Sequence, residues 1–487
     1  MMRKSSLLLS ALLLFGMLAS CGEAASAPPA SVTDVPGTAE AVTEPEETDP
    51  LGYLPDKDFG GRTFTILTRN SMEYEFLAEE QTGDIINDAV YERNHAIEDR
   101  YNVKINLVAK ETTWGGGDKF NSELDASIMA GDSDYDMVAG YAAMILGAVQ
   151  QGLFVNWYDV PHIDITKPWW SPQIADSLTI NGRMYAMTGD IALSIWEGMV
   201  CMYYNKKLAD SYSTGDVYQT VKDGSWTFDR FLSVVSKVSG DLDGDTKYTD
   251  ADLYGYVSSY STPIDTFMPA FDIQVVKRGD DGWLYYTINS EKTVSALEKM
   301  KALFFSGDNF ALTNGTSDFR KIFKEDRSLF YAADLRQSAN LRDMETDYGI
   351  VPYPKFDDLQ EKYYSTSTDG FSLILFPSTV KDTEFVGLIT EALCSVSSSV
   401  IIPTYYDVAL KDKYNRDSQS SEMLDIIRDS LIYDVGYLNS FALDTAGHLF
   451  VQLVREGKTD FASAYAKKEK TFQKRLDKML EAYGDAE

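Results

Sequence analysis

The sequence predicts an α/β protein made of two lobes. Its 487 residues are more than one hydrophobic core usually serves. Segments with strand and helix patterns alternate from about residue 58 onward, which is typical of sheets covered by helices. A strongly apolar strand in the middle of the chain begins directly after a tryptophan and a glutamate. The apolar fraction of 44% and aromatic fraction of 13% exclude a disordered chain.

The first part of the chain predicts a mostly parallel sheet. Residues 63–68 (TFTILT) alternate like a strand, residues 84–100 carry an apolar stripe at helical spacing, and residues 103–108 (VKINLV) alternate again. This order is a βαβ unit. A helix around Phe120, Leu124 and Ile128, a strand over residues 135–139 and a helix over residues 142–151 continue the pattern.

The middle stretch, residues 181–205 (NGRMYAMTGDIALSIWEGMVCMYYN), organises the rest of the chain. It predicts a short strand at 183–187, polar turns, and a second strand at 199–204. That second strand is almost continuously apolar, as expected for a strand covered on both faces. Trp196 and Glu197 stand at its beginning. We expect the chain to cross between lobes here and to leave an indole and a carboxylate in the cleft.

Beyond this crossing, the pattern predicts further elements in both lobes. A helix is expected at residues 206–212. The other expected helices and strands, in chain order, are helices at 227–238 and 291–305, strands at 328–332, 347–354 and 370–376, and helices at 382–396 and 460–483.

The N-terminus predicts export from the cell. Arg3 and Lys4 precede an apolar run over residues 7–18, so residues 1–20 are expected to be a signal peptide. Leu18, Ala19, Ser20 and Cys21 resemble the bacterial lipobox, in which the cysteine is lipidated, with palmitate for example, and becomes the new N-terminus. The alternative is an ordinary signal peptide that is cleaved elsewhere. Residues 21–57 then form a disordered, acidic linker.

Charge and cysteine content restrict the partners. The formal net charge of −31 argues against nucleic acid or an anionic membrane surface as the main partner. The lipid on Cys21 would instead hold the protein at the extracellular face of the cell membrane. The other two cysteines, Cys201 and Cys394, are expected to be buried thiols and not a disulfide framework.

The order of these features resembles the extracellular solute-binding lipoproteins of ABC importers, the family that includes maltose-binding protein. Gly182 and Arg183 before a polar turn, and the strand that ends in Tyr204 and Asn205, carry much of the resemblance. It spans residue 58 to the C-terminus and also rests on residues 148–154 and 379–393. The residues 353–355 (YPK), with Arg416, Asp417, Met423 and Leu424, are similar to a clostridia-like subgroup.

The resemblance implies a two-lobed, type II periplasmic-binding-protein-like fold with three hinge crossings. We expect these crossings near Trp196, near residues 368–369 and near residues 405–407. Lobe 1 would contain residues 58–195 and 369–406, and lobe 2 residues 196–368 and 407–487. A ligand that touches both lobes would favour a closed form.

A sugar site combines flat aromatic side chains with carboxylates, amides and arginine, because sugars have apolar C–H faces and polar rims. Trp196 and Glu197 are the first candidates by position, and the family places ligand contacts at Tyr141, Asp334 and Arg336. The full set of expected ligand-binding residues is Tyr141, Trp169, Trp170, Trp196, Glu197, Asp334, Arg336, Asp369, Tyr405 and Tyr406.

Several of these candidates also have a structural interpretation. Trp196 could simply pack the hinge, and Asp334 could pair with Arg336 at the surface. Of the adjacent Trp169 and Trp170, at most one is expected to line the cleft.

An acidic loop resembles an EF-hand-type calcium loop. Its candidate ligands are the carboxylates of Asp241, Asp243 and Asp245, the carbonyl of Lys247, and the carboxylate of Asp252. The sixth position is Thr246 where glycine is usual, and the last ligand is Asp where Glu is usual. The alternative is an acidic surface loop without a metal. No cofactor is required for function, and calcium would stiffen the loop.

Nothing in the sequence favours catalysis. The three histidines, His95, His162 and His448, form no HExxH motif, and there is no GxSxG motif. We therefore expect a lipid-anchored, monomeric, non-enzymatic protein that delivers a sugar or oligosaccharide to an ABC permease. A peptide or polyol ligand, a surface carbohydrate-capture or sensor lipoprotein without transport, and a secreted hydrolase are the alternatives.

Overall fold

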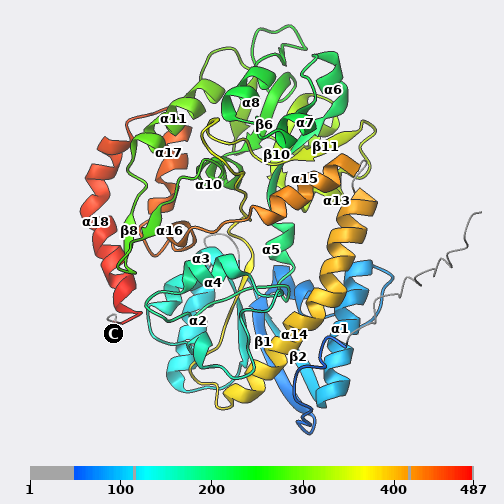
Figure 1. Ribbon diagram of the computed structural model, residues 1–487, viewed down its shortest axis with the longest axis vertical. Helices are drawn as coiled ribbons and strands as arrows, with labels where there is room; N and C mark the ends of the chain where they lie inside the picture. The colour runs from blue at the N-terminus through cyan, green and yellow to red at the C-terminus, as the bar shows by residue number, and fades with distance from the viewer. Residues whose placement is uncertain (1–48, 113–116, 415–417, 485–487) are drawn as a thin grey trace, which may run out of the picture. The chain divides into compact units, whose positions relative to one another are not determined.

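The computed structural model describes residues 49–112, 117–414 and 418–484. The signal peptide, Cys21 and most of the predicted linker lie outside the described residues, as do Arg416 and Asp417. Figure 1 shows two sheets within Asp49–Glu487, with β1 and β2 in the lower half and β6, β10 and β11 in the upper half.

The first sheet has four strands in the order β12-β3-β1-β2. Their bounds are β1 Arg62–Arg69, β2 Val103–Lys110, β3 Met137–Tyr141 and β12 Ser372–Leu375. β1 is parallel to both β2 and β3, and β12 joins as an antiparallel edge strand from far along the chain. The predicted parallel sheet is therefore confirmed, with one antiparallel addition.

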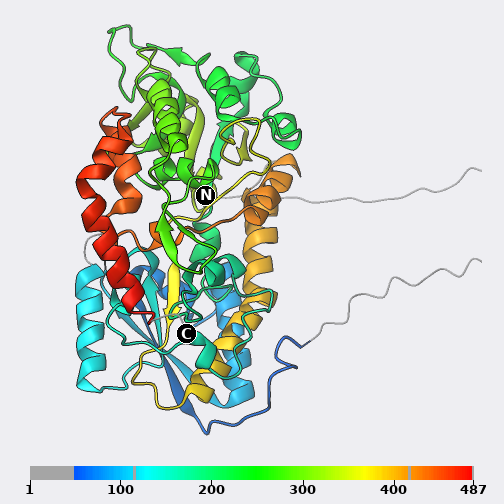
Figure 2. The same ribbon diagram turned by 60° about the vertical axis from the view of Figure 1, so that its left-hand side comes forward.

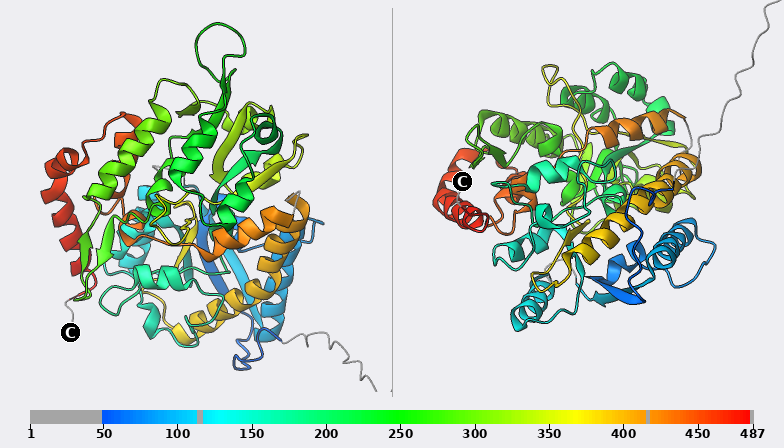
Figure 3. Two further views of the ribbon diagram at one scale, coloured as in Figure 1. Left: turned by 45° about the horizontal axis from the view of Figure 1, so that its top comes forward. Right: turned by 60° about the horizontal axis from the view of Figure 1, so that its bottom comes forward.

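Helices surround this sheet: α1 Ile85–Tyr101, α2 Gly117–Ala130, α3 Ala142–Val149 and α14 Thr383–Pro403. Asp84 caps α1 by accepting hydrogen bonds from the amides of Ile86 and Asn87, which is why the helix begins there. α14 packs along α1 (Figure 3).

α14 and the residues after it, Thr383–Val408, form the one helix of the described residues that is long and apolar enough to span a membrane. However, 78% of its most apolar stretch is buried in the protein. It is therefore a core helix of the first lobe. Cys394 in this helix and Cys201 in β4 are both free and buried, as predicted.

The second sheet is mixed, in the order β11-β4-β10-β6-β5, with β9 beside β6. Its strands are β4 Val200–Asn205, β5 Ser239–Gly240, β6 Leu253–Ser259, β9 Ala311–Asn314, β10 Ser328–Asp334 and β11 Tyr348–Val351. β4 runs antiparallel between β10 and β11 and is buried along its whole length. Its central place explains the continuous apolar run in the sequence.

The helices of the second lobe complete the structure. Those near the second sheet are α6 Lys206–Ser211, α7 Val217–Lys222, α8 Phe228–Val235, α11 Glu291–Phe304, α12 Phe319–Lys324, α13 Gln337–Leu341 and α15 Ser418–Asp429. A hairpin of β7 Val276–Arg278 and β8 Leu284–Tyr286 precedes α11 in the chain. The last helices are α16 Val435–Leu438, α17 Leu449–Arg455 and α18 Phe461–Glu481.

The chain passes between the two sheets at three places. It runs from β3 to β4 through the short helix α5 Ser194–Glu197, from β11 back to β12, and from α14 through the segment Thr404–Tyr414 to α15, which packs on β11. Single bridges from Met199 to Ser367 and from Ser365 to Leu431 hold extended segments side by side between the sheets. Two α/β lobes thus share several connecting segments.

The predicted strand at 183–187 is wrong. This segment forms isolated bridges only, between Ile180 and Arg183 and between Met187 and Ile374. Asn181 and Gly182 both have positive φ, at 50° and 70°, so the chain turns tightly and pairs with itself. The expected turn at Trp196 is instead the end of α5.

Candidate functional site

Polar side chains gather where the strands of both sheets end between the lobes. Arg69 is the last residue of β1, Tyr141 of β3 and Asp334 of β10, while Glu197 ends α5 just before β4. In α/β proteins these strand ends are where ligands bind.

Glu197 connects residues that follow strands of different sheets. The hydroxyl of Tyr74, which follows β1, donates to Oε2 of Glu197. The Nε of Arg336, which follows β10, lies 3.5 Å from the same oxygen. Burial raises the pKa of Glu197, and Arg336 and Tyr74 partly oppose the rise. These three residues border a cavity of about 320 Å³ that Tyr405 also lines.

A second group lies on the first lobe around Arg69. Its side chain is buried, its Nη2 donates to the carbonyl of Gly370 at 2.7 Å, and its guanidinium lies 4.4 Å from the centre of the Tyr141 ring. Its Nε is buried and finds no hydrogen-bond partner among the described residues. Asp369 precedes Gly370, and burial raises the pKa of its carboxyl to about 6. Tyr141, Arg69 and Asp369 therefore form one cluster.

On the second lobe, Asp334 offers an unused acceptor. Within the part of the chain that the structure describes, its Oδ1 is buried without a hydrogen-bond partner. Burial raises the pKa of its carboxyl, although Arg336 opposes the rise. Asp334 borders a cavity of about 320 Å³ together with Ser259, Arg320 and Gln337. Buried polar atoms are rarely left unpaired, so this oxygen suits a hydroxyl or amine of a bound solute.

Trp196 points to a different cavity from its neighbour Glu197. Its indole Nε1 donates to Asp190 at 3.1 Å, and its ring lies edge-on to Tyr406 at 6.1 Å. The cavity that it borders, of about 420 Å³, is lined by Trp169, Trp170 and Tyr433 but not by Glu197. Burial raises the pKa of Asp190 to about 7.

Trp169 and Trp170 are both held by the core helix α14. Their indole nitrogens donate to the two carboxylate oxygens of Glu391, at 3.1 and 2.8 Å. Trp170 is almost completely buried, at 1% exposure. Both residues border the Trp196 cavity, and neither borders the Glu197 cavity. The two adjacent tyrosines divide in the same way, since Tyr405 lines the Glu197 cavity and Tyr406 contacts Trp196.

Sequence reasoning missed several residues of the site. Arg69 and Tyr74 were not predicted, and neither was Glu75, which accepts hydrogen bonds from the amide of Ser194 and the hydroxyl of Ser372. The available signal was the charged Arg69 at the end of a strand whose last residues are buried. Asp265 was also missed. It accepts from the hydroxyl of Tyr437 at 3.0 Å, and burial raises the pKa of its carboxyl to about 8.

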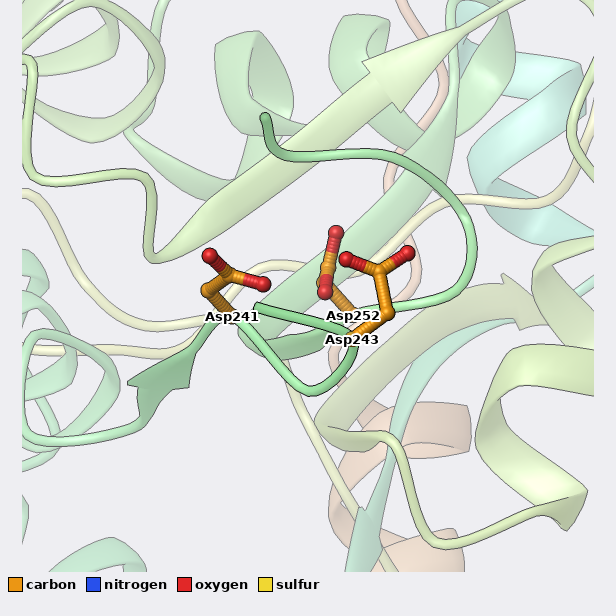
Figure 4. A group of neighbouring side chains, drawn as sticks. All are labelled: Asp241, Asp243 and Asp252. Atoms are coloured by element: carbon orange, nitrogen blue, oxygen red, sulfur yellow. The ribbon is translucent and has the colours of Figure 1, made fainter. Parts of the chain in front are cut away.

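The acidic loop brings three of its four predicted carboxylate ligands together. One oxygen from each of Asp241, Asp243 and Asp252 lies within 4.8 Å of the others (Figure 4). Asp245 is not in this group, and one of its carboxylate oxygens accepts from the Lys247 amide at 2.7 Å. The Lys247 carbonyl stays a predicted ligand. The Asp245 amide stabilises the Asp243 carboxylate, but burial and three neighbouring aspartates outweigh it and raise the pKa of Asp243. Calcium binding stays a prediction.

Comparison with known proteins identifies the family. Residues 95–386, more than half of the chain, match the family model described as bacterial extracellular solute-binding protein. The chain belongs to this family. Its members bind solutes outside the cytoplasm, so a solute-binding role and an extracellular or periplasmic location follow for this member. No curated protein matches it in sequence.

Solved structures confirm the fold. The galacto-N-biose/lacto-N-biose I-binding protein of a Bifidobacterium longum ABC transporter, solved with lacto-N-biose, has a TM-score of 0.58 at 11% identity, covering 86% of this chain and 99% of its own. The maltose/maltodextrin-binding domain MalE of Bdellovibrio bacteriovorus, solved with maltotriose, has a TM-score of 0.54 at 13% identity. The match covers 87% of this chain and 100% of that chain. UgpB of Mycobacterium tuberculosis, solved with glycerophosphocholine, has a TM-score of 0.55 at 14% identity. The match covers 86% of this chain and 99% of that chain. The two-lobed α/β fold predicted from the sequence is thus confirmed.

Proposed function

We propose that this solute-binding protein captures a sugar or oligosaccharide between its lobes and delivers it to an ABC permease. The observation that carries the proposal is the position of Glu197, which is joined to Tyr74 from one lobe and to Arg336 from the other. A solute that exchanges hydrogen bonds with this group contacts both lobes at once. Such a solute favours the closed arrangement, because only that arrangement supplies all its partners.

The chemistry of the cleft suits a sugar. Tyr74, Tyr141 and Tyr405 offer flat rings with polar tips, which match the C–H faces and hydroxyl groups of a pyranose. Glu197, Asp334 and Asp369 accept hydrogen bonds from hydroxyls, and Arg336 and Arg69 donate to them. Sugars supply both donors and acceptors, so one ligand class satisfies all of these groups.

The proposal includes an anchor and a division into lobes. Lipid on Cys21 would hold the protein at the extracellular face of the membrane, and the predicted linker would let the lobes reach the permease. The described end of that linker, residues 49–57, is not disordered but packs on the first lobe, with Leu51 and Leu54 buried in the core. Residues 58–195 with 369–406, and 196–368 with 407–487, would move as two bodies. The protein would act as a monomer without catalysis. Metabolic labelling with palmitate tests the anchor: label in the natural chain and none in Cys21→Ser is expected, and label in both contradicts it.

A thermal-shift screen across saccharides, peptides and polyols tests the ligand class. We expect a saccharide to raise the melting temperature of the natural protein and to have a much smaller effect on Glu197→Gln. Stabilisation by a peptide and by no saccharide would contradict the sugar assignment. Formation of products from a glycan panel would favour the secreted hydrolase. Permease genes beside the gene for this chain would separate an importer from a capture or sensor lipoprotein.

A phosphorylated polyol is the second candidate. Arg69 has a buried Nε that no described residue pairs, Arg320 borders the Asp334 cavity, and Arg336 borders the Glu197 cavity between the lobes. Guanidinium groups bind phosphate well, and a protein of the same fold was solved with glycerophosphocholine. If glycerophosphodiesters stabilise the protein more than any saccharide, and Arg69→Lys removes the effect, this candidate replaces the sugar.

A further inference from the structure

A polar cavity lies away from the Glu197 group, between helices of the two lobes. It has a volume of about 400 Å³. One wall comes from α2 and from α3 with the residues after it, which belong to the first lobe, and the other from Phe441, Ala442 and Arg475, the last of these on α18. Figures 1 and 2 show α18 descending from the second lobe towards α2 and α3. None of the lining residues belongs to the Glu197 cavity.

Two lining residues present buried polar atoms without partners. Asp125 is 9% exposed, and its Oδ2 accepts from the side-chain amide of Gln151. Its Oδ1 is buried, and none of residues 49–112, 117–414 and 418–484 gives it a hydrogen bond. The Nε2 of Gln150 is also buried, and no residue in these ranges pairs with it. An unpaired acceptor and an unpaired donor that line one cavity are costly for the protein alone. They indicate a ligand that supplies both a donor and an acceptor.

The remaining walls define the shape of such a ligand. Phe441 is 42% exposed, so part of its ring is open, and Met144, Gly147 and Ala148 add further apolar surface. The exposed Arg475 supplies additional donors at the rim. An apolar wall with donors and acceptors at its edge fits a ring with one apolar face and hydroxyl groups around it. The volume is within the range of small-molecule sites.

We propose that this cavity is a second binding site, which takes a small six-membered ring carrying several hydroxyl groups. One hydroxyl donates to Oδ1 of Asp125, another accepts from Nε2 of Gln150, and the C–H face of the ring lies against Phe441. Because the walls come from both lobes, the occupant favours one arrangement of the lobes. By linkage, it changes the affinity of the cleft for its solute.

The test uses the full chain and myo-inositol, a six-membered ring with a hydroxyl on every carbon, followed by saturation-transfer NMR and titration. In Asp125→Asn, the Gln151 amide keeps the remaining carboxamide oxygen, so an NH₂ group replaces the unpaired oxygen and the acceptor is lost. In Gly147→Trp, an indole fills the cavity, and the new Cβ has no heavy atom within 4 Å. We expect Asp125→Asn to bind the probe at least about tenfold more weakly than the natural protein, the loss typical of a hydrogen bond to a charged group. Gly147→Trp should weaken binding at least as much, because its indole occupies the volume that the probe needs.

Two controls separate this site from the cleft. Met129→Trp adds a tryptophan on an exposed part of α2 and should bind the probe normally. Glu197→Gln removes the cleft carboxylate and should also keep probe binding, even where it loses the cleft solute. The proposal is overturned if the natural protein does not bind myo-inositol at about 20 mM, a concentration well above a dissociation constant of about 1 mM. It is also overturned if Glu197→Gln abolishes binding of the probe while Asp125→Asn does not. If Gly147→Trp fails to fold, Asp125→Asn decides.

Discussion

Trp196 and Glu197 are neighbours in one short helix, yet they belong to different environments. Glu197 faces Tyr74, Arg336 and a cavity between residues of both sheets. Trp196 gives its indole hydrogen bond to Asp190, which lies six residues earlier, and its ring meets Tyr406 beside a cavity that contains Trp169 and Trp170. On the Glu197 side of α5, hydrogen bonds and an ion pair join residues of the two lobes. On the Trp196 side, indole rings pack together.

The comparison teaches that an aromatic residue beside a cleft is not itself evidence of a sugar platform. All three indoles of the Trp196 cavity already donate to buried carboxylates, those of Asp190 and Glu391. They hold α14 and the hinge together. On the other side, Tyr74 is 38% exposed beside Glu197 and Arg336, and we expect a solute to contact this group. The two sides of α5 should therefore respond differently to mutation.

Loss of the Glu197 carboxylate should have the largest effect. We expect Glu197→Ala to weaken solute binding by about 10- to 100-fold, because a charge-assisted hydrogen bond contributes roughly 1.5–3 kcal/mol. Isothermal titration with the best saccharide of the screen measures this. Trp196→Phe is the matched control on the same helix and should keep affinity within about threefold. Equal losses in both variants would remove the distinction between the two sides.

Loss of the Trp196 indole should affect stability more than binding. We expect Trp196→Ala to lower the free energy of unfolding by about 2 kcal/mol, less than for a fully buried tryptophan, because its ring is only half-buried. Urea unfolding measures the change. Tyr74→Phe serves as the comparison on the other side of α5, where we expect weaker solute binding with a smaller loss of stability. The reverse pattern would mean that the indole side is the solute site.

The buried carboxyl of Asp265 should make stability depend on pH. Its pKa is raised from 3.8 to about 8, mainly by burial, with Asp369 adding to the rise and the Tyr437 hydroxyl and Arg455 opposing it. Between these values the folded protein keeps a proton that the unfolded chain has released. Stability therefore falls as pH rises from about 4 to about 8 and then levels off.

Asp265→Asn removes this penalty while keeping an oxygen for Tyr437 to donate to. The variant should melt at a higher temperature than the natural protein at pH 8, and the difference should vanish near pH 4. Melting curves across this range measure it. A difference that is the same at every pH would mean that Asp265 does not titrate in this window.

Calcium should have the smallest effect. If Asp241, Asp243 and Asp252 hold the ion, titration calorimetry should show heat at millimolar calcium, as for other extracellular sites. Asp243→Asn should abolish that heat, and Asp250→Asn, which removes an equal charge outside the group, should retain it. No heat in the natural protein removes the calcium prediction.

Local patterns predicted most of the fold because its elements follow local rules. Asp84 caps α1 through amides two and three residues away. The alternating pattern of β1 and the continuous apolar run of β4 each predict a strand from neighbouring residues alone. The prediction of a strand at 183–187 was wrong because Asn181 and Gly182 adopt positive φ, and the resulting tight turn was not visible in the side-chain pattern. The candidate site was harder to predict. Tyr74 lies 123 residues from Glu197, and Glu75 lies 297 residues from Ser372, so only the folded chain reveals these partners.

Hydrogen exchange with and without the saccharide that stabilises the protein most tests the central claim directly. If the solute is held by residues of both lobes around Glu197, amides at residues 69–75 and at 334–337 should become protected together. Protection confined to residues 168–173 and 428–433, on the other side of α5, would contradict it.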